Sequence, residues 1–298
     1  MKKSIIALAV AGAMTAPMIA QADATLFGEI RWDLDKVENT KAKSDITRMR
    51  IGVKGSEEMD NGMTAGYFIR LDAGTNAAGT GAGKSDGSIN AHKTTLYVSG
   101  GFGKLVFGDS GSAQEISEDR IAYSTFSEGL DILGDGKDTG GGIRYESNSM
   151  SGVKVILSVG NINNSDVTGI SNVGGAISYD NDAFGVTLSA GQDSVAGAET
   201  AVGISADTTI AGVTVGLNFA KIDSLKSNGF AAKYSITDST SVAMNYQTQK
   251  NTNVAKKSYV TVSANHNLGG NASLNAAYVA KNDAAGNDQL KLRYKVTF

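Results

Sequence analysis

The chain of 298 residues contains no cysteine, a single proline, and 27 basic against 30 acidic side chains, which gives a net charge of −3. The absence of cysteine excludes a disulfide framework and a thiolate metal site, and the negative charge argues against nucleic acid as a partner. Beyond the N-terminal segment no run of about 18 apolar residues occurs, so transmembrane helices are excluded as well.

The N-terminal residues 1–22 have the organisation of an export signal. Lys2 and Lys3 precede an apolar stretch over 5–13, and Ala20-Gln21-Ala22 forms a small-x-small cleavage site. An N-terminal transmembrane helix is the alternative, but the apolar run is short and no stop-transfer flank follows it. We therefore expect a signal peptide over 1–22 and a single domain over 23–298.

The first part of the expected mature chain alternates apolar and polar residues in short runs. Over 25–34 the apolar side chains fall on one face and the charged side chains on the other, and the pattern repeats over 45–55, 62–72, 89–99 and 104–109. Alternation with a period of two predicts β-strands that have one apolar and one polar face. Asp60-Asn61-Gly62 adds the Asn-Gly signal of a tight hairpin.

The stretch 109–140 interrupts this rhythm. Arg120 and Lys137 are its only basic residues. Its eight acidic residues are Asp109, Glu115, Glu118, Asp119, Glu128, Asp131, Asp135 and Asp138. A loop of this length inside a compact domain either has a function or argues against the assignment of elements. We expect it to fold into the interior of the domain.

Alternation resumes after this stretch and continues to the C-terminus. The predicted strands are 143–146, 153–159, 173–180, 183–192, 198–208, 210–221, 226–236, 239–250, 256–268, 270–281 and 287–298, which brings the total to sixteen. Short turns alternate with longer polar loops, as they do in even-stranded membrane barrels. The last strand ends in an aromatic residue, Phe298, and is suited to pair with the first strand so that no edge is left in lipid.

The persistence of a polar face on every strand decides the predicted fold class. In a barrel the polar set faces a water-filled lumen and the apolar set faces lipid. Ten residues at ~3.3 Å each, tilted by about 45°, rise roughly 23 Å, which matches the apolar band of outer-membrane barrels. We therefore predict an all-β, antiparallel transmembrane β-barrel of sixteen strands. A soluble β-sandwich or solenoid is the alternative.

Several segments resemble those of the Gram-negative general porins, the trimeric, sixteen-stranded diffusion channels of the outer membrane. They are ATLFGEI (24–30), IGVKGSEE (51–58) with the Asn61-Gly62 turn, GGFGKLVFG (100–108) and YKVTF (294–298). The resemblance spans the mature chain. It implies an outer-membrane protein that contacts lipid, forms homotrimers with copies of itself, and passively conducts ions and small hydrophilic solutes without a cofactor.

The resemblance also implies a pore constriction. In this family the third external loop folds inward and its acids face arginines on the opposite wall, so it assigns 109–140 to that loop. The expected acidic side is Asp109, Glu115, Glu118, Asp119 and Glu128, and the expected basic wall is Arg31, Arg48, Arg50, Arg70 and Arg144. Strand alternation independently puts these arginines on the polar face. Relatives often carry an arginine at the position of Asp109, so we expect weak cation selectivity.

Two motifs suggest enzymes but lack the required context. GDSGS (108–112) imitates a serine-protease nucleophile, yet a triad needs a histidine base, and alternation puts both His92 and His266 on apolar faces. The stretch 78–85 resembles a loosened phosphate-binding loop but joins two predicted strands and feeds no helix. Residues 135–138 lack the oxygen count of a calcium site. We expect no enzymatic activity, no cofactor and no metal, although an outer-membrane esterase barrel is the enzyme alternative.

Two further alternatives are not enzymes. A substrate-selective porin for a sugar or another nutrient would carry an aromatic track inside the lumen, and the predicted inward aromatic side chains are few: Phe27, Phe68, Tyr97 and Tyr259. A structural or adhesin barrel that does not conduct would need long external loops, which this chain lacks. We therefore place both behind a general diffusion pore.

Overall fold

The computed structural model describes residues 24–73, 89–126, 132–133, 141–160, 172–193, 200–252, 255–282 and 287–298. The predicted signal peptide and most of the second half of 109–140, including Glu128, lie outside these ranges. No helix among the described residues has the length and hydropathy needed to cross a bilayer.

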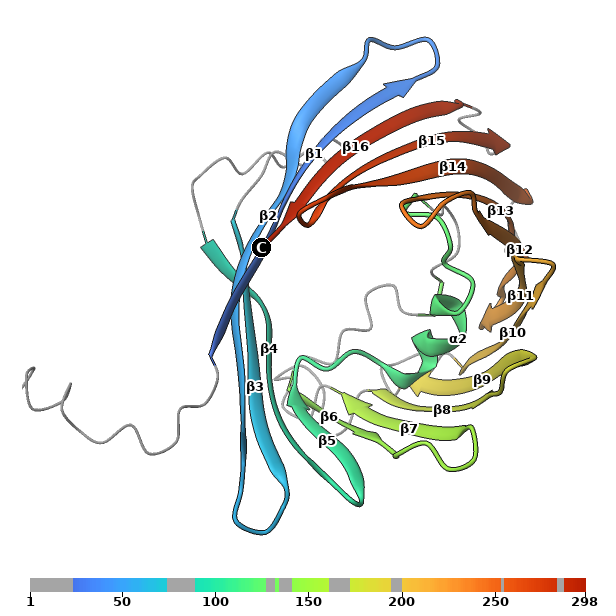
Figure 1. Cartoon of the computed structure of the whole chain (residues 1–298). Coiled ribbons are helices and arrows are strands. Elements are labelled where there is room, and N and C mark those ends of the chain that lie inside the picture. The colour runs from blue at the N-terminus through green and yellow to red at the C-terminus, as the bar shows by residue number, and fades with distance from the viewer. Residues whose placement is uncertain are drawn as a thin grey trace, which may run out of the picture.

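Sixteen strands form one closed antiparallel barrel, which confirms the predicted fold class (Figure 1). In chain order they are β1 (Thr25–Val37), β2 (Lys43–Glu58), β3 (Thr64–Ala73), β4 (Ile89–Gly100), β5 (Gly103–Gly108), β6 (Gly142–Glu146), β7 (Val153–Gly160), β8 (Asn172–Asp180), β9 (Phe184–Asp193), β10 (Thr200–Ile210), β11 (Val213–Ile222), β12 (Leu225–Ser235), β13 (Thr240–Lys250), β14 (Lys257–Gly269), β15 (Ala272–Asn282) and β16 (Gln289–Thr297). Each strand pairs with its neighbours in sequence, and β1 also pairs with β16.

The barrel closes between the first and last strands, as the C-terminal pattern predicts. Gly28 and Phe298 exchange backbone hydrogen bonds of 2.9 and 3.1 Å, and the register runs from Glu29 opposite Thr297 to Val37 opposite Gln289. The Phe298 ring covers Gly28 so closely that a Cβ there would lie 2.2 Å from the ring. Closure satisfies the backbone groups that an open edge would expose to lipid.

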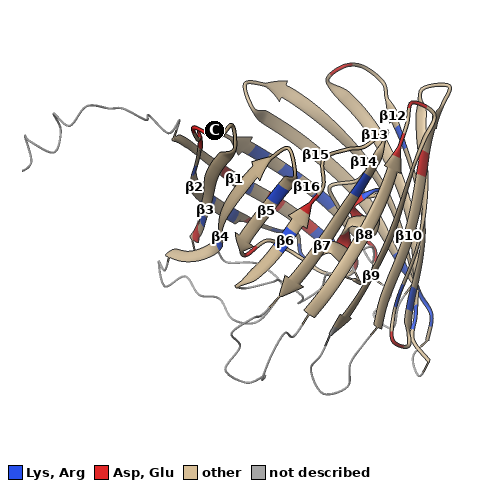
Figure 2. Ribbon diagram, turned by 90° about the horizontal axis from the view of Figure 1, so that it is seen from below, with Lys and Arg blue, Asp and Glu red and all other residues tan. Residues whose placement is uncertain are grey.

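The two faces of the wall differ in polarity in the manner expected of a lipid-facing barrel. Leu217 on β11 is 60% exposed, whereas its neighbour Asn218 is 7% exposed. The same alternation of exposed apolar and covered polar side chains recurs around the barrel. Charged positions lie within strands as well as at their ends (Figure 2). The wall therefore presents an apolar exterior and a polar lumen.

The predicted alternation of short and long connections holds over part of the barrel, because 38–42 has the same length as 59–63, and 147–152 the same length as 194–199. At the short-turn end, Ala211 and Gly212 join β10 to β11 with positive φ angles of 50° and 80°. At the opposite end, where long loops are predicted, Asp223 and Ser224 alone join β11 to β12. At the long-loop end of the barrel, a tight turn rather than a loop therefore connects β11 and β12.

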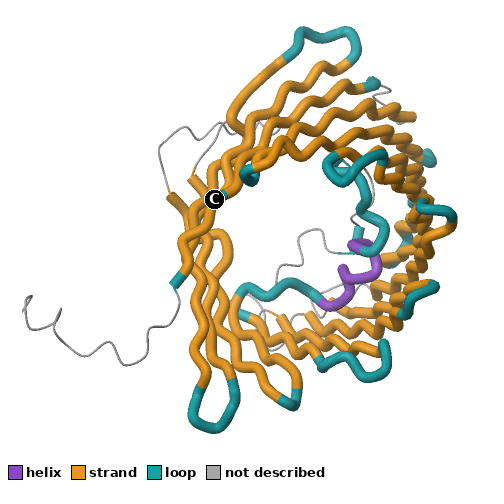
Figure 3. Tube along the Cα trace, in the orientation of Figure 1, coloured by secondary structure: helices purple, strands orange, loops and turns teal. Residues whose placement is uncertain are grey.

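The segment after β5 contains the only helices that the structure describes. They are η1 (Ala113–Glu115) and α2 (Ile116–Asp119). A capping box begins η1, because Ser112 Oγ accepts from the Gln114 N–H and the Glu115 carboxylate accepts from the Ser112 N–H. In Figure 3 this segment lies within the ring of strands. The two helices contact the inner face of the wall at β7 to β11.

Candidate functional site

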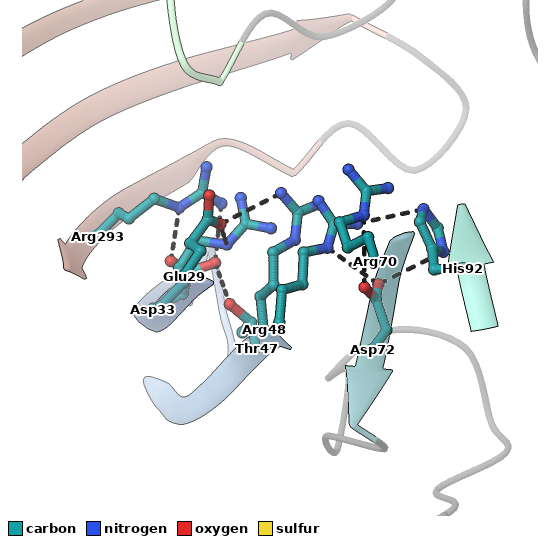
Figure 4. A network of polar contacts seen from close by, with 10 residues as sticks. Glu29, Asp33, Thr47, Arg48, Arg70, Asp72, His92 and Arg293 are labelled. Carbon is teal, nitrogen blue, oxygen red and sulfur yellow. Dashed lines mark hydrogen bonds and ion pairs between the residues drawn. The ribbon is translucent and has the colours of Figure 1, made fainter. Parts of the chain in front are cut away.

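The lumen-facing side of β1 to β4 and β16 carries a network of charged groups, which we call the wall cluster (Figure 4). Alternate positions along β1, β2 and β3 point into the lumen, so charged residues two apart in sequence lie side by side. The members are Arg31, Arg48, Arg50, Arg70, Arg293, Glu29, Asp33, Asp72, Thr47 and His92.

The tightest pair of the wall cluster crosses the closure between β1 and β16. Arg293 donates from Nε and Nη2 to the two oxygens of Asp33, at 2.7 and 2.8 Å. This fork geometry is the strong form of the arginine–carboxylate interaction. Thr47 donates a further hydrogen bond of 2.8 Å to the same carboxylate. Asp33 is therefore held rigidly at 7% exposure.

The other arginines of the wall cluster share two carboxylates. Arg50 Nε lies 3.0 Å and Arg70 Nε 3.7 Å from oxygens of Asp72, while Arg48 and Arg31 lie 3.4 and 3.9 Å from Glu29. Five guanidinium groups thus face three carboxylates, and the cluster keeps a net positive charge. Guanidinium groups stay charged at any physiological pH, so this field is permanent.

The structure corrects one prediction that was based on the alternation of side chains along a strand. His92 was expected on the apolar face of its strand, but its ring lies 3.4 Å from Asp72 and 3.5 Å from Arg50 inside the lumen. The reason is a β-bulge, because Arg70 pairs with Lys93 and Leu71 pairs with Ala91, which leaves His92 as the extra residue. A bulge reverses the alternation of side chains beyond it. The partners of His92 among the described residues are Arg50 and Asp72.

The segment after β5 is held to the wall by an ionic anchor at Arg120. Its guanidinium donates to Asp207 on β10, to Asp180 at 2.7 Å and to Thr187 at 2.9 Å. Burial disfavours the charge of Arg120, but the hydrogen bonds to the two carboxylates outweigh burial and raise its pKa. The one arginine outside the predicted lumen strands therefore fixes α2 to the wall.

A second anchor lies within the segment itself. The Glu118 carboxylate accepts hydrogen bonds from the backbone N–H of Ile132, at 3.0 and 3.1 Å, and of Leu133, at 2.8 Å. Glu118 is 3% exposed. A charged acceptor makes such bonds about twice as strong as neutral ones. Glu118 therefore joins α2 to residues 132–133.

Apolar contacts reinforce these anchors. Ile121 and Leu133 are completely buried; Ile121 packs on Ala231, and Leu133 packs against Ala201 and Ala220. Burying a side chain of this size contributes about 1.5–3 kcal/mol. Small lumen-facing alanines on β10, β11 and β12 thus give the segment a flat surface to dock on.

Glycines on the inner face let the segment approach the backbone. A Cβ at Gly191 on β9 would lie 1.7 Å from Gln114 Oε1, and one at Gly203 on β10 would lie 2.1 Å from Ser117 Oγ. Ser117 is held there by a 2.8 Å hydrogen bond to Ser189. Any larger residue at these two positions would occupy the space of the segment.

Burial also changes the chemistry of Tyr123, which follows α2. Its ring contacts the Ile121–Ala231 packing, and burial, helped by the nearby Asp207 carboxylate, raises the pKa of its hydroxyl to about 12. The neutral phenol is therefore the form that the docked segment favours.

The far end of the described segment reaches the wall cluster. Thr125 donates to Asn275 on β15 at 3.1 Å, and Arg293 lies over the Phe126 ring at 4.4 Å from its centre. A cation over an aromatic face is an attractive contact. Segment and cluster thus meet at Arg293.

The predicted site residues fall into three groups. Arg31, Arg48, Arg50 and Arg70 are together in the wall cluster. Arg144 lies apart, 3.1 Å from Glu146, and donates to the Ser110 carbonyl at the start of the segment. Among the predicted acids Asp109 is half-buried beside β4, Glu115 caps η1, Glu118 anchors the segment, Asp119 is exposed, and Glu128 lies outside the described residues.

Sequence reasoning left out the acids that pair with the arginines. Glu29, Asp33 and Asp72 come from the strands, and each occupies a lumen-facing position next to an arginine. Strand parity could have found them, because it put Glu29, Asp33 and Asp72 on the same faces as the arginines. Within the described ranges, no three His, Asp or Glu side chains are grouped so that they could hold a metal ion.

Comparisons with known sequences identify related outer-membrane proteins. A family model described as Gram-negative porin matches residues 7–286. The major outer membrane protein P.IB of Neisseria lactamica is 29% identical over 203 residues, which cover 62% of this chain and 57% of that protein. The P.IB protein of Neisseria gonorrhoeae is 34% identical over 124 residues, or 38% of this chain and 33% of that protein. The chain spans about half the length of these relatives or less.

Solved structures share the architecture over nearly the whole chain. An anion-selective porin from Comamonas acidovorans matches with a TM-score of 0.73 and 18% identity, over 93% of this chain and 100% of that one. In vitro folded OmpT of Vibrio cholerae, in its trimer form, matches with a TM-score of 0.74 and 14% identity, over 92% and 99%. At these identities the likeness establishes the barrel fold alone.

Proposed function

This chain belongs to the Gram-negative porin family of outer-membrane barrels, and we propose that it forms a water-filled pore for the passive diffusion of ions and small hydrophilic solutes. The observation that carries the proposal is the polar lumen of a closed barrel, partly filled by a docked segment that leaves the wall cluster on β1 to β4 facing it. Such a pore needs neither a cofactor nor catalytic groups.

The constriction of this pore lies, in our proposal, between the wall cluster and the segment 109–140. The contact of Phe126 with Arg293 brings the two together, and the anchors at Arg120 and Glu118 hold the segment within the barrel. Fixed charges across a narrow passage orient water and polar solutes and disfavour apolar ones. The predicted acids Asp109, Glu115, Asp119 and Glu128 belong to this proposal as the negative side.

Ion preference is the part of the sequence prediction that the described side chains do not support. Weak cation selectivity was expected because Asp109 stands where relatives often carry an arginine. Of the acids in 109–140, Glu118 is engaged in hydrogen bonds within the segment. The wall cluster has five guanidinium groups against three carboxylates. This excess supports a mild preference for anions, which we propose in place of the cation preference.

Planar-bilayer recording in a KCl gradient tests both proposals. A pore gives a large ohmic conductance, and an anion preference gives a reversal potential of the corresponding sign. A cation-selective reversal potential would mean that the acids of 109–140 outweigh the wall cluster. A folded barrel that never conducts would contradict the pore and point to a structural or adhesin barrel.

A homotrimer is the proposed assembly, on the resemblance to trimeric porins and the trimer form of the Vibrio cholerae neighbour. Outer-membrane lipid is then the second partner, around the apolar exterior. Conductance that rises in groups of three equal steps, together with the mass of the detergent-solubilised protein, tests this assembly. Single, independent steps and a monomeric mass would contradict it.

A further inference from the structure

We propose that the lumen contains a binding site for aromatic carboxylates, which adjoins the wall cluster at Arg70. A cavity of about 600 Å³ opens on the inner face of β1 to β5. The lining residues that matter are Lys54, Phe68, Arg70, Lys93, Tyr97 and Lys104. The volume falls within the range of about 300–1,000 Å³ found for small-molecule sites.

The charge of the cavity selects an anion. Four basic groups line it, and no aspartate or glutamate is among the described residues that line it. Arg70 is balanced by Asp72 at 3.7 Å, but Lys54, Lys93 and Lys104 form no salt bridge with any described residue. Lys104 lies opposite Glu146 across β5 and β6, whereas Lys54 and Lys93 have no carboxylate within salt-bridge distance among the described residues. These ammonium groups, on a partly enclosed wall, attract a carboxylate from the lumen.

The aromatic rings of the cavity give the ligand its second property. Phe68 stacks on Phe27 with ring centres 4.9 Å apart, and Lys54 and Lys104 lie 5.8 and 4.1 Å from the Phe27 and Tyr97 ring centres. Apolar ring faces and ammonium groups thus alternate across the wall. A flat aromatic body with one anionic substituent matches this arrangement better than a sugar or an inorganic anion.

Two glycines leave room for the aromatic rings to lie against the backbone of the neighbouring strand. A Cβ at Gly66 would lie 2.3 Å from the Tyr97 ring, and one at Gly52 would lie 2.3 Å from the Phe27 ring. Both rings therefore lie flat against the backbone of the neighbouring strand. The Phe27 ring backs Phe68, which lines the cavity, and Lys104 lies over the Tyr97 ring. This packing fixes the site before a ligand arrives, which reduces the entropy lost on binding.

The cavity lies nearer the short-turn end of the barrel than the wall cluster does. Lys54 and Phe68 face each other across β2 and β3, four residues further toward the Asp60-Asn61-Gly62 turn than Arg50 is in β2. The inference rests on the proposed pore, because a solute reaches this wall through the lumen. It adds a substrate class, and it revives the substrate-selective alternative that few inward aromatic side chains had disfavoured.

The test uses benzoate as the probe and acetate as its counterpart without a ring. Two readouts are needed: the block of KCl conductance in planar bilayers, and binding of labelled benzoate to the detergent-solubilised protein by equilibrium dialysis. We expect benzoate to reduce the conductance at concentrations at least about tenfold lower than acetate does. Equal potency of the two anions in both readouts would overturn the site.

Variants locate the binding. Lys54→Gln with Lys93→Gln should raise the half-blocking and half-binding concentrations of benzoate about tenfold or more, which corresponds to about 1.4 kcal/mol. The matched control is Lys233→Gln, which removes a lumen-facing lysine on β12 beside the docked segment and should leave benzoate within about twofold of the unmodified protein. An equal effect of the control would mean general electrostatic attraction and would overturn the site.

A third variant isolates the aromatic contribution. Phe68→Leu keeps the charges and much of the volume, so it should weaken benzoate while leaving acetate unchanged. Unchanged benzoate binding in this variant would overturn the aromatic part of the inference. Heat-modifiable gel mobility verifies that each variant has folded into a barrel. The dialysis readout separates the two proposals: loss of KCl conductance with benzoate still bound would contradict the pore alone, whereas a conducting pore without selective binding would contradict the site alone.

Discussion

Arg120, at the end of α2, donates a hydrogen bond from Nη1 to Asp207 on β10. The same guanidinium reaches Asp180 and Thr187, so one side chain bridges the segment to three positions on the wall. The segment is therefore held to the wall by a charged bridge as well as by apolar packing.

Replacing this arginine should release the segment while leaving the barrel intact. Arg120→Met removes the shared cation and leaves Asp207 without it, so we expect the docked state to lose about 3 kcal/mol. The measurement is hydrogen exchange of the amides of 113–122, with proteolysis of the same stretch. Arg120→Lys keeps the charge but loses the planar fork of the guanidinium. Its amide protection should therefore fall between that of the unmodified protein and that of Arg120→Met. Equal protection in all three proteins would contradict the anchor.

The carboxylate of Glu118 makes a prediction about two specific amides. Glu118→Gln leaves one acceptor oxygen for the two N–H groups of Ile132 and Leu133, and removes the charge that strengthens both bonds. We expect about 1–2 kcal/mol less stability and exchange of these two amides about tenfold faster. Glu57→Gln, at an exposed position at the end of β2, is the matched control. Unchanged exchange at 132 and 133 in Glu118→Gln would contradict this role.

The close approach at Gly203 can be tested by filling it. Gly203→Val places methyl groups where Ser117 and Leu133 lie, and overpacking of this kind costs about 1–3 kcal/mol. Increased proteolysis of 109–126 and noisier single-channel currents are expected. Gly175→Val on β8 is the matched control, because a Cβ there would meet Leu157 at 3.5 Å and the Ile156 carbonyl at 3.9 Å, which are ordinary contacts. If both variants behave alike, the effect belongs to the strands rather than to the segment.

The hydroxyl of Tyr123 predicts sensitivity to alkaline pH. Its pKa is raised to about 12 from a usual 10.0, so its contribution to docking is complete below about pH 10 and declines as the pH rises toward 12. Ultraviolet difference titration of Tyr123→Phe should lack a component with a midpoint near 12 that the unmodified protein shows. A missing component with a midpoint near 10 would place Tyr123 in solvent and contradict its burial.

The wall cluster makes a prediction about ion preference. Arg48→Ala combined with Arg50→Ala removes two positive charges from the lumen and leaves Asp72 with less compensation, so the preference should shift toward cations. The reversal potential in a KCl gradient measures the shift, and higher salt should reduce it through screening. Lys154→Ala, near the short-turn end of β7, is the control. A reversal potential unchanged by the double substitution would place these arginines away from the constriction.

The sequence was sufficient for the strands because the period of two is a local signal that each strand carries independently. The lumen-facing arginines follow from the same signal. Parity failed at His92, since a β-bulge depends on the pairing of two strands rather than on either strand alone. The residues around His92 give no sequence signal that a β-bulge occurs there.

The docking of the segment could not be derived from local pattern either. Gly191 and Gly203 are ordinary glycines in a glycine-rich sequence until the register shows that both lie under the segment. Glu118 is likewise one of eight acids in the stretch 109–140. Only the folded segment shows that it accepts hydrogen bonds from two N–H groups fourteen and fifteen residues away. Tertiary contacts, which sequence spacing does not encode, separate anchoring acids from exposed ones.

The described part of the docked segment packs on β7 to β12 and reaches β15 and β16 through Thr125 and Phe126, whereas the cavity lies on β1 to β5. The two arcs of the barrel therefore carry different evolutionary constraints. Substitutions under the segment must preserve a footprint of glycine and alanine, whereas the charges and rings on β1 to β5 are constrained by one another rather than by that footprint. On the proposed function, substitutions on these strands would change what the pore admits without altering the surface on which the segment docks.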